Sequence, residues 1–212
     1  MSVSAYLPSV LNLIETIQGC LQQRMVTDDD VGKEAARILT LLEPLPSQEG
    51  DFSRSSHPST RHLDAALTVR NASTTGLLAA IRPIAFDLPW RYSYARRADA
   101  PGLEDNMAFA EIIGPEAPFK SQKVCLGLTL IGPDTLYPPH VHPAIELYYV
   151  AAGTASWIMN GVSTLNRPGA FILHPSKAIH AMQTHMEPLL AVYSWSGEDV
   201  KTLSEYAPFT SP

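Results

Sequence analysis

The chain has 212 residues, of which 45% are hydrophobic and 17% charged, and its 15 basic and 21 acidic side chains give a net charge of −6. These values exclude a disordered chain, and the acidic balance argues against the clustered basic surface that nucleic-acid binding requires. The apolar stretches fall well short of the roughly 18 residues that cross a bilayer, so no membrane contact is expected.

The first third of the chain predicts helices. Over 11–21, apolar residues recur at spacings of three and four, which is typical of one face of an amphipathic helix. A second helix is expected over 30–42, where acidic residues open the segment and Pro44 stops it. A third is expected from about 63 to 81. These helices form a predicted N-terminal region covering residues 1–82.

Between the second and third helices, residues 47–62 are rich in Ser, Pro and His and predict a loop. His57 and His62 fall in or at the end of this loop, and His185 also lacks neighbours typical of a site. All three are interpreted as solvated surface residues.

From Pro83 onward the sequence changes to short runs rich in β-branched and aromatic residues, separated by Gly, Pro and Asn. Asn160-Gly161 between two such runs is a strong signal for a two-residue hairpin. Many short strands at close spacing predict a mostly β domain, a sandwich or barrel, over 83–212. The expected strands cover 90–94, 107–113, 123–131, 145–151, 154–159, 170–173 and 189–195.

Cys20 and Cys125 lie far apart in unlike contexts and form no metal-type pair. They are interpreted as buried thiols, which suits a reducing compartment. The N-terminus has no basic stretch and is interrupted by Pro8, so a signal peptide is not expected. A cytoplasmic location is predicted.

The most informative segment contains His140 and His142. If this stretch is extended, residues two apart project to the same side. Glu146 and Tyr148 share one parity of the following strand, and an intervening turn can bring them beside His142. Two imidazoles and a carboxylate that converge in this way are an ordinary ligand set for a first-row transition metal.

A further ligand is expected from a strand across the barrel. His174 and His180 are the two candidates. His174 precedes Pro175 and is interpreted as a turn residue rather than a ligand.

The order and spacing of these residues resemble the double motif of the cupin superfamily, which implies a cupin β-barrel. The matching positions are His140, His142, Glu146 and Gly153, followed by Pro168, Gly169, Ala170 and the later His180.

Further details resemble the cupin-type dimethylsulfoniopropionate lyases of marine bacteria. Tyr148 stands on the metal-facing side, Tyr137 precedes the histidine pair, Trp195 lies on the last strand, and a helical region precedes the barrel. The stretch 109–119 is also similar to that family.

The resemblance implies a carbon–sulfur lyase that cleaves dimethylsulfoniopropionate, a small zwitterion, by β-elimination to acrylate and dimethyl sulfide. His142, Glu146 and His180 are implied as ligands of one divalent metal ion, and Tyr148 as the base. His140 is implied as a further ligand or a pocket residue. Tyr137 and Trp195 are implied as pocket residues that hold the substrate.

The donor set does not choose among Zn, Fe, Mn, Co and Ni. Tyr149 and Tyr193 are additional candidates for an aromatic contact with the sulfonium group.

Two other functions stay open on the sequence. One is another cupin metalloenzyme, an oxygenase or isomerase of a small acid. The other is a non-enzymatic cupin that binds a small ligand, against which the metal-facing Tyr148 argues. A homodimer through the helices or the barrel edge is possible, but no residue indicates it.

Overall fold

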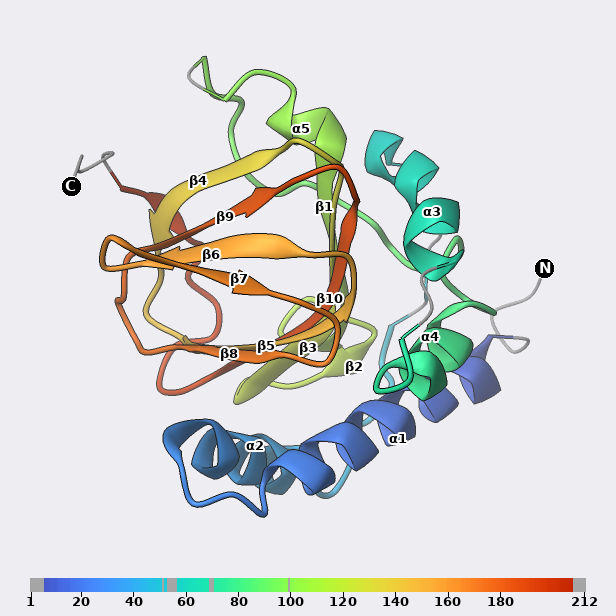
Figure 1. Ribbon diagram of the computed structural model, residues 1–212. Helices are drawn as coiled ribbons and strands as arrows, with labels where there is room; N and C mark the ends of the chain where they lie inside the picture. The colour runs from blue at the N-terminus through green and yellow to red at the C-terminus, as the bar shows by residue number, and fades with distance from the viewer. Residues whose placement is uncertain (1–5, 51, 53–56, 69–70, 99, 208–212) are drawn as a thin grey trace.

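Two β-sheets face each other as a barrel, and helices cover one outer side of it (Figure 1). The structure is a computed structural model that describes residues 6–50, 52, 57–68, 71–98 and 100–207. Residues 1–5, on which the signal-peptide expectation partly rests, lie outside this range. Within the described residues, no helix combines the length and the apolar character that a membrane crossing needs.

The strands form a six-stranded sheet in the order β2-β1-β3-β10-β5-β8 and a five-stranded sheet in the order β11-β4-β9-β6-β7. Apart from the parallel pair β1 and β2, the paired strands are antiparallel. This arrangement confirms the expected mostly β barrel with N-terminal helices. The strands are β1 Met107–Gly114, β2 Phe119–Lys120, β3 Val124–Ile131, β4 Leu136–Val141, β5 Ile145–Ala152, β6 Ala155–Met159, β7 Val162–Asn166, β8 Phe171–His174, β9 His180–Thr184, β10 Leu189–Ser196 and β11 Glu205–Tyr206.

The helical region contains the two long helices that the apolar periodicity predicts, followed by shorter ones. The side chain of Asp29 accepts a hydrogen bond from the Gly32 amide at 2.8 Å and so caps the second long helix. The helices are α1 Leu7–Arg24, α2 Asp30–Leu41, a 3-10 helix Pro58–His62, α3 Leu63–Thr68, α4 Thr75–Ile81 and α5 Leu103–Asn106.

The central strands of the six-stranded sheet are buried on both faces. Every residue of β3 and of β10 is buried, because one face meets the helices and the other lines the barrel. In β5 the two faces separate by parity. Leu147 and Tyr149 belong to the core shared with the helices, whereas Tyr148 and Val150 belong to the core inside the barrel.

This shared core means that the helices and the outer face of the sheet bury each other's apolar surface. Helix α4, the last helix before residue 82, ends at Ile81, and the first strand, β1, begins at Met107. The division at 82 and 83 stays a prediction.

The prediction of one helix over 63–81 was wrong. Two short helices, α3 and α4, replace it, and residues 69–70 lie outside the described residues. The Asn71 side chain accepts hydrogen bonds from the amide and the hydroxyl of Ser73, at 2.9 and 2.6 Å. Such local side-chain bonds compete with helical backbone bonds, which fits the turn that precedes α4.

The strand predicted over 90–94 was also wrong. Only Arg91 forms a bridge, with Phe109 of β1. The alternating aromatic residues have another cause: Trp90 is buried and donates to the Ala85 carbonyl, while Tyr92 and Tyr94 pack on the barrel core. The alternation reflects the packing of a loop rather than a strand in a sheet.

His57 and His62 are half-buried, which corrects the interpretation of both as solvated. His57 precedes the 3-10 helix, and its Nδ1 accepts from the Ser59 amide. His185 is exposed, as predicted. The hairpin at Asn160-Gly161 is confirmed, because both residues have positive φ and the turn joins β6 to β7.

Candidate metal centre

Strand register gathers the polar side chains of the barrel interior at one place. His140 on β4 pairs with His180 at the start of β9. Glu146 on β5 pairs with His174 of β8 on one side and with Trp195 of β10 on the other. Residues far apart in the sequence therefore meet inside the barrel.

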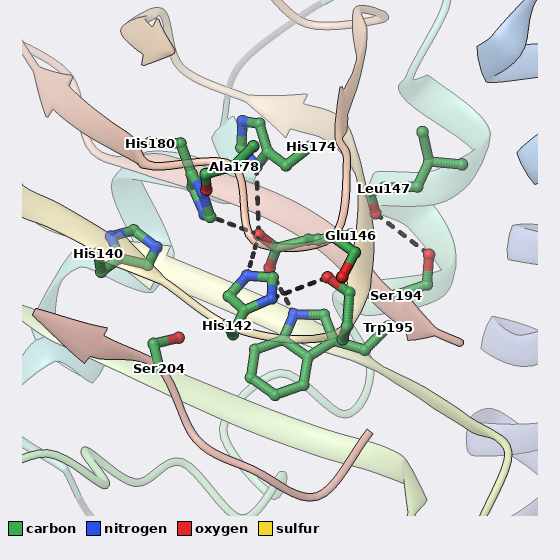
Figure 2. Close-up of polar contacts among 12 residues, drawn as sticks. His140, His142, Glu146, Leu147, His174, Ala178, His180, Ser194, Trp195 and Ser204 are labelled. Atoms are coloured by element: carbon green, nitrogen blue, oxygen red, sulfur yellow. Dashed lines mark hydrogen bonds and ion pairs between the residues drawn. The ribbon is translucent and has the colours of Figure 1, made fainter. Parts of the chain in front are cut away.

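His140, His142, Glu146 and His180 each offer a ligand atom, and these atoms lie within 4.8 Å of one another. The Nε2 atoms of His142 and His180 both lie 3.1 Å from Oε2 of Glu146 (Figure 2). All four residues are buried. The structure thus brings together the ligand residues that the sequence predicts.

The backbone fixes which nitrogen of each histidine faces the cluster. A carbonyl oxygen only accepts hydrogen bonds, so a ring nitrogen beside it carries the proton. This leaves the other nitrogen, Nε2, as a free electron-pair donor toward the cluster, as metal-binding histidines require. The Nδ1 atoms of His140, His142 and His180 lie 2.8, 3.0 and 2.8 Å from the carbonyl oxygens of Pro138, Ala144 and Ala178.

The Nε2 of His180 has no hydrogen-bond partner among the described residues, although it is buried. Because its Nδ1 holds the proton, its lone pair faces the carboxylate oxygen of Glu146 at 3.1 Å. Two electron-rich atoms at this distance repel each other unless a cation lies between or beside them. The donor set therefore fits a metal ion.

The charges of the cluster agree with this conclusion. Burial opposes the ionisation of Glu146, but the charge and hydrogen bond of His142 and the hydrogen bond of His174 outweigh it and hold the Glu146 pKa well below its usual value. Burial lowers the pKa of His142, yet Glu146 outweighs this effect and raises it. A bound cation would supply to Glu146 the positive charge that His142 otherwise supplies.

Tyr148 is fully buried on the same face of β5 as Glu146. Burial, and after it the negative charge of Glu146, raises the Tyr148 pKa well above its usual value. Burial and the neighbouring His180 lower the His140 pKa well below its usual value, so His140 is neutral.

A pocket of about 260 Å³ gives access to the cluster. His140, Glu146 and Tyr148 line it, whereas His142 and His180 do not. Aromatic residues form part of the remaining wall and include the two residues predicted to hold a substrate, Tyr137 and Trp195. Charged residues line it as well: Arg91, Glu111, Glu116 and Lys201.

Tyr137 and Trp195 also contact the cluster itself. The Tyr137 ring stacks on His140 with 3.8 Å between ring centroids. The Trp195 ring stacks on His142 at 4.4 Å, and its Nε1 donates to Oε1 of Glu146 at 2.7 Å (Figure 2). Only the ring of Trp195, not its N–H group, is therefore available to a substrate.

The two further aromatic candidates have different positions. Tyr193 lines the pocket. Tyr149 points to the opposite face of β5, where its ring stacks on Phe171 and its hydroxyl donates to the Ser73 carbonyl. Tyr149 therefore contacts no substrate in the pocket, and this candidate was wrong.

The interpretation of His174 as a turn residue was wrong. It is the last residue of β8, completely buried, with Nδ1 3.2 Å from Oε2 of Glu146. Burial lowers the His174 pKa to about 4, so the imidazole is neutral. The following Pro175 marks the end of a strand rather than a turn that contains the histidine.

Among the pocket residues that sequence reasoning missed are the aromatic Tyr94 and Phe109. Their rings pack edge to face at 5.9 Å, and the Tyr94 hydroxyl donates to Ser204. The alternation of aromatic residues around Tyr94 was the available signal, but it also suits a strand.

Comparison with known proteins places this geometry in a family. Residues 32–191 match the dimethylsulfoniopropionate lyase family. The chain belongs to this family. The resemblance noted in the sequence is thus confirmed.

Two curated relatives of the family resemble the chain in sequence. A Cereibacter sphaeroides protein assigned as the dimethylsulfoniopropionate lyase DddL is 31% identical over 157 residues, which is 73% of this chain and 66% of that protein. The dimethylsulfoniopropionate lyase DddQ of Ruegeria pomeroyi is 32% identical over 110 residues, 51% of this chain and 55% of that protein. The chain thus matches less than two thirds of the length of either relative.

Solved structures confirm the fold. A chain from the crystal structures of the lyases RdDddP and RnDddQII aligns with a TM-score of 0.81 at 23% identity, covering 98% of this chain and 100% of that one. The crystal structure of DddQ from Ruegeria pomeroyi aligns with a TM-score of 0.78 at 23% identity, covering 94% and 96%.

Proposed function

We propose that this protein is a metal-dependent carbon–sulfur lyase that cleaves dimethylsulfoniopropionate to acrylate and dimethyl sulfide. The observation that carries the proposal is the buried histidine–glutamate cluster, which opens through His140 and Glu146 into a pocket that Tyr148 and other aromatic residues partly line. Membership of the lyase family supports the substrate class.

His142, Glu146 and His180 are the proposed metal ligands, with His140 as a fourth. When bound, a divalent cation supplies a Lewis acid for the substrate carboxylate and a positive charge that offsets the Glu146 charge near Tyr148. The ligand types suit Zn, Fe, Mn, Co and Ni alike.

Tyr148 is the proposed base, because it lines the pocket on the same strand face as Glu146. As a phenolate it takes the proton from the carbon next to the substrate carboxylate. The electron pair of that C–H bond forms the new C=C bond. The C–S bond breaks with its electron pair remaining on sulfur, which leaves as neutral dimethyl sulfide.

The aromatic wall is proposed to hold the cationic end of the substrate. Faces of Tyr and Trp rings attract such a cation by roughly 0.5–2 kcal/mol each. Tyr137, Tyr193 and Trp195 line the pocket together with Tyr94 and Phe109.

The direct test is headspace detection of dimethyl sulfide, with acrylate measured in the same vial, after the substrate is added to purified protein loaded with each metal in turn. We expect equal amounts of both products, with and without oxygen. Absence of products with every metal contradicts the lyase proposal. Oxygen-dependent consumption of substrate indicates an oxygenase instead.

We also propose a cytoplasmic location, which the two unpaired thiols of Cys20 and Cys125 support. A homodimer stays a prediction.

A further inference from the structure

His174 contacts two of the proposed metal ligands without being one of them. It pairs with Glu146 across β5 and β8, and its imidazole stacks on His180 with 3.8 Å between ring centroids and 25° between planes. Its exposed fraction is 0%. It does not belong to the group of four residues whose ligand atoms lie mutually close.

The hydrogen bond of His174 differs from those of the proposed ligand histidines. Those three use Nδ1–H to donate to backbone carbonyls. His174 instead directs Nδ1 at Oε2 of Glu146, 3.2 Å away (Figure 2). A carboxylate oxygen that binds a cation can only accept hydrogen bonds, so Nδ1 of His174 carries the proton in this contact.

The opposite side of the imidazole is consistent with this tautomer. The Nε2 of His174 is buried and has no hydrogen-bond partner within the described part of the chain. A proton there would be a buried donor left without an acceptor, which is unfavourable. The ring thus makes one hydrogen bond, and its acceptor is a proposed metal ligand.

Each carboxylate oxygen of Glu146 accepts one hydrogen bond from a residue that is not a proposed metal ligand. Trp195 donates from Nε1 to Oε1 at 2.7 Å, and His174 lies at Oε2. An oxygen of a carboxylate has two acceptor sites, so Oε2 can bind a cation while it accepts from His174. Two donors on different oxygens fix both the plane and the direction of the carboxylate.

We propose that His174 is a positioning residue: its Nδ1–H holds Oε2 of Glu146 in the direction in which that oxygen binds the metal. The inference rests on the metal site of the proposed function but not on the identity of the substrate. Partners of this kind around a metal ligand are worth about 10–100-fold in metal affinity.

The test compares two variants of equal size and branching. In His174→Asn the side-chain amide can replace the Nδ1–H donor, whereas His174→Leu has no donor. Zinc affinity is measured by competition with a chromophoric chelator, and the visible absorption spectrum of the cobalt-loaded protein reports the ligand geometry.

For His174→Leu we expect zinc affinity to fall by about 10–100-fold and the cobalt spectrum to change. His174→Asn should stay close to wild type in both measurements. Equal losses in the two variants would overturn the proposal, because they indicate packing or direct ligation by the imidazole. Unchanged affinity in both would overturn it as well.

A measurement on the wild-type protein does not depend on how the variants fold. Nitrogen-15 NMR of the zinc-loaded protein should show the Nδ1–H tautomer for His174, and the Nε2–H tautomer contradicts the proposal. If the wild-type protein binds no metal at all, the proposed function fails at its metal site. That result is distinct from a wild-type protein that binds metal and shows no difference between the variants.

Discussion

The two faces of β5 carry neighbouring residues with opposite tasks. On the inner face, Glu146 and Tyr148 line the pocket. On the outer face, Leu147 and Tyr149 join the core that α1, α2 and α4 form with the sheet. Both faces are buried, so burial does not distinguish them. What separates them is the chemistry of the neighbours, imidazoles on one side and aliphatic side chains on the other.

One strand thus serves as both scaffold and site, because alternate side chains point to opposite faces. Variants on the inner face should change metal binding or turnover, and variants on the outer face should change stability.

The largest expected effect follows the loss of the ligand carboxylate. Glu146→Gln removes the negative charge that faces the Nε2 atoms of His142 and His180. We expect metal content, measured by elemental analysis, to fall far below one ion per chain, and product formation to fall to background.

The matched control is Glu34→Gln. Glu34 is another buried carboxylate, but it lies on α2 and contacts the Ser196 hydroxyl outside the barrel. It should keep full metal content. A Glu146→Gln protein with one tightly bound metal ion per chain contradicts the ligand assignment.

The next largest effect is a loss of turnover expected at Tyr148, for which the adjacent Tyr149 is the control. Tyr148→Phe removes the proposed base and should lower turnover by about 10²–10⁴-fold, while metal content stays at the wild-type level. Tyr149→Phe removes the same atom from the other face, where it bonds to Ser73, and turnover should stay close to wild type. Dimethyl sulfide release by the two proteins at equal metal loading checks the pair. Equal activities contradict the role of Tyr148.

The parity of β5 could be predicted because it depends only on the period of a strand and on the spacing of Glu146 and Tyr148. The placement of His140 and His142 on one side could be predicted in the same way, because it depends only on their spacing of two residues. His180 could be placed only through the family resemblance, since no local pattern brings β9 next to β4.

His174 could not be placed, because its role depends on the register between β8 and β5, which the sequence does not state. Its neighbour Pro175 suits the end of a strand as well as a turn. The position of Tyr94 in the pocket wall was missed for a related reason. Alternating aromatic residues have the same pattern in a strand and in a loop packed on a hydrophobic wall. Local periodicity therefore predicted the faces of strands but not which distant segments meet.

The smallest effect on turnover is expected for Leu147→Ala, next to the metal ligand in sequence. Leu147 is buried in the core shared with the helices, so its truncation should lower the free energy of unfolding by about 2–5 kcal/mol. Urea unfolding of the metal-free protein measures this change. Turnover per metal-loaded, folded molecule should remain at the wild-type level.

Tyr148→Phe is the converse variant, since it should lose turnover with little change in unfolding free energy. Together the two variants test whether the faces of β5 are separable at neighbouring positions. A Leu147→Ala protein that keeps its metal and fold but loses turnover would show that the helix-facing core sets the geometry of Glu146 as well as supporting the sheet. The hydrogen bond from Ser194 to the Leu147 carbonyl, at 3.2 Å, holds this part of the backbone independently of the leucine side chain, which is the physical reason to expect the opposite.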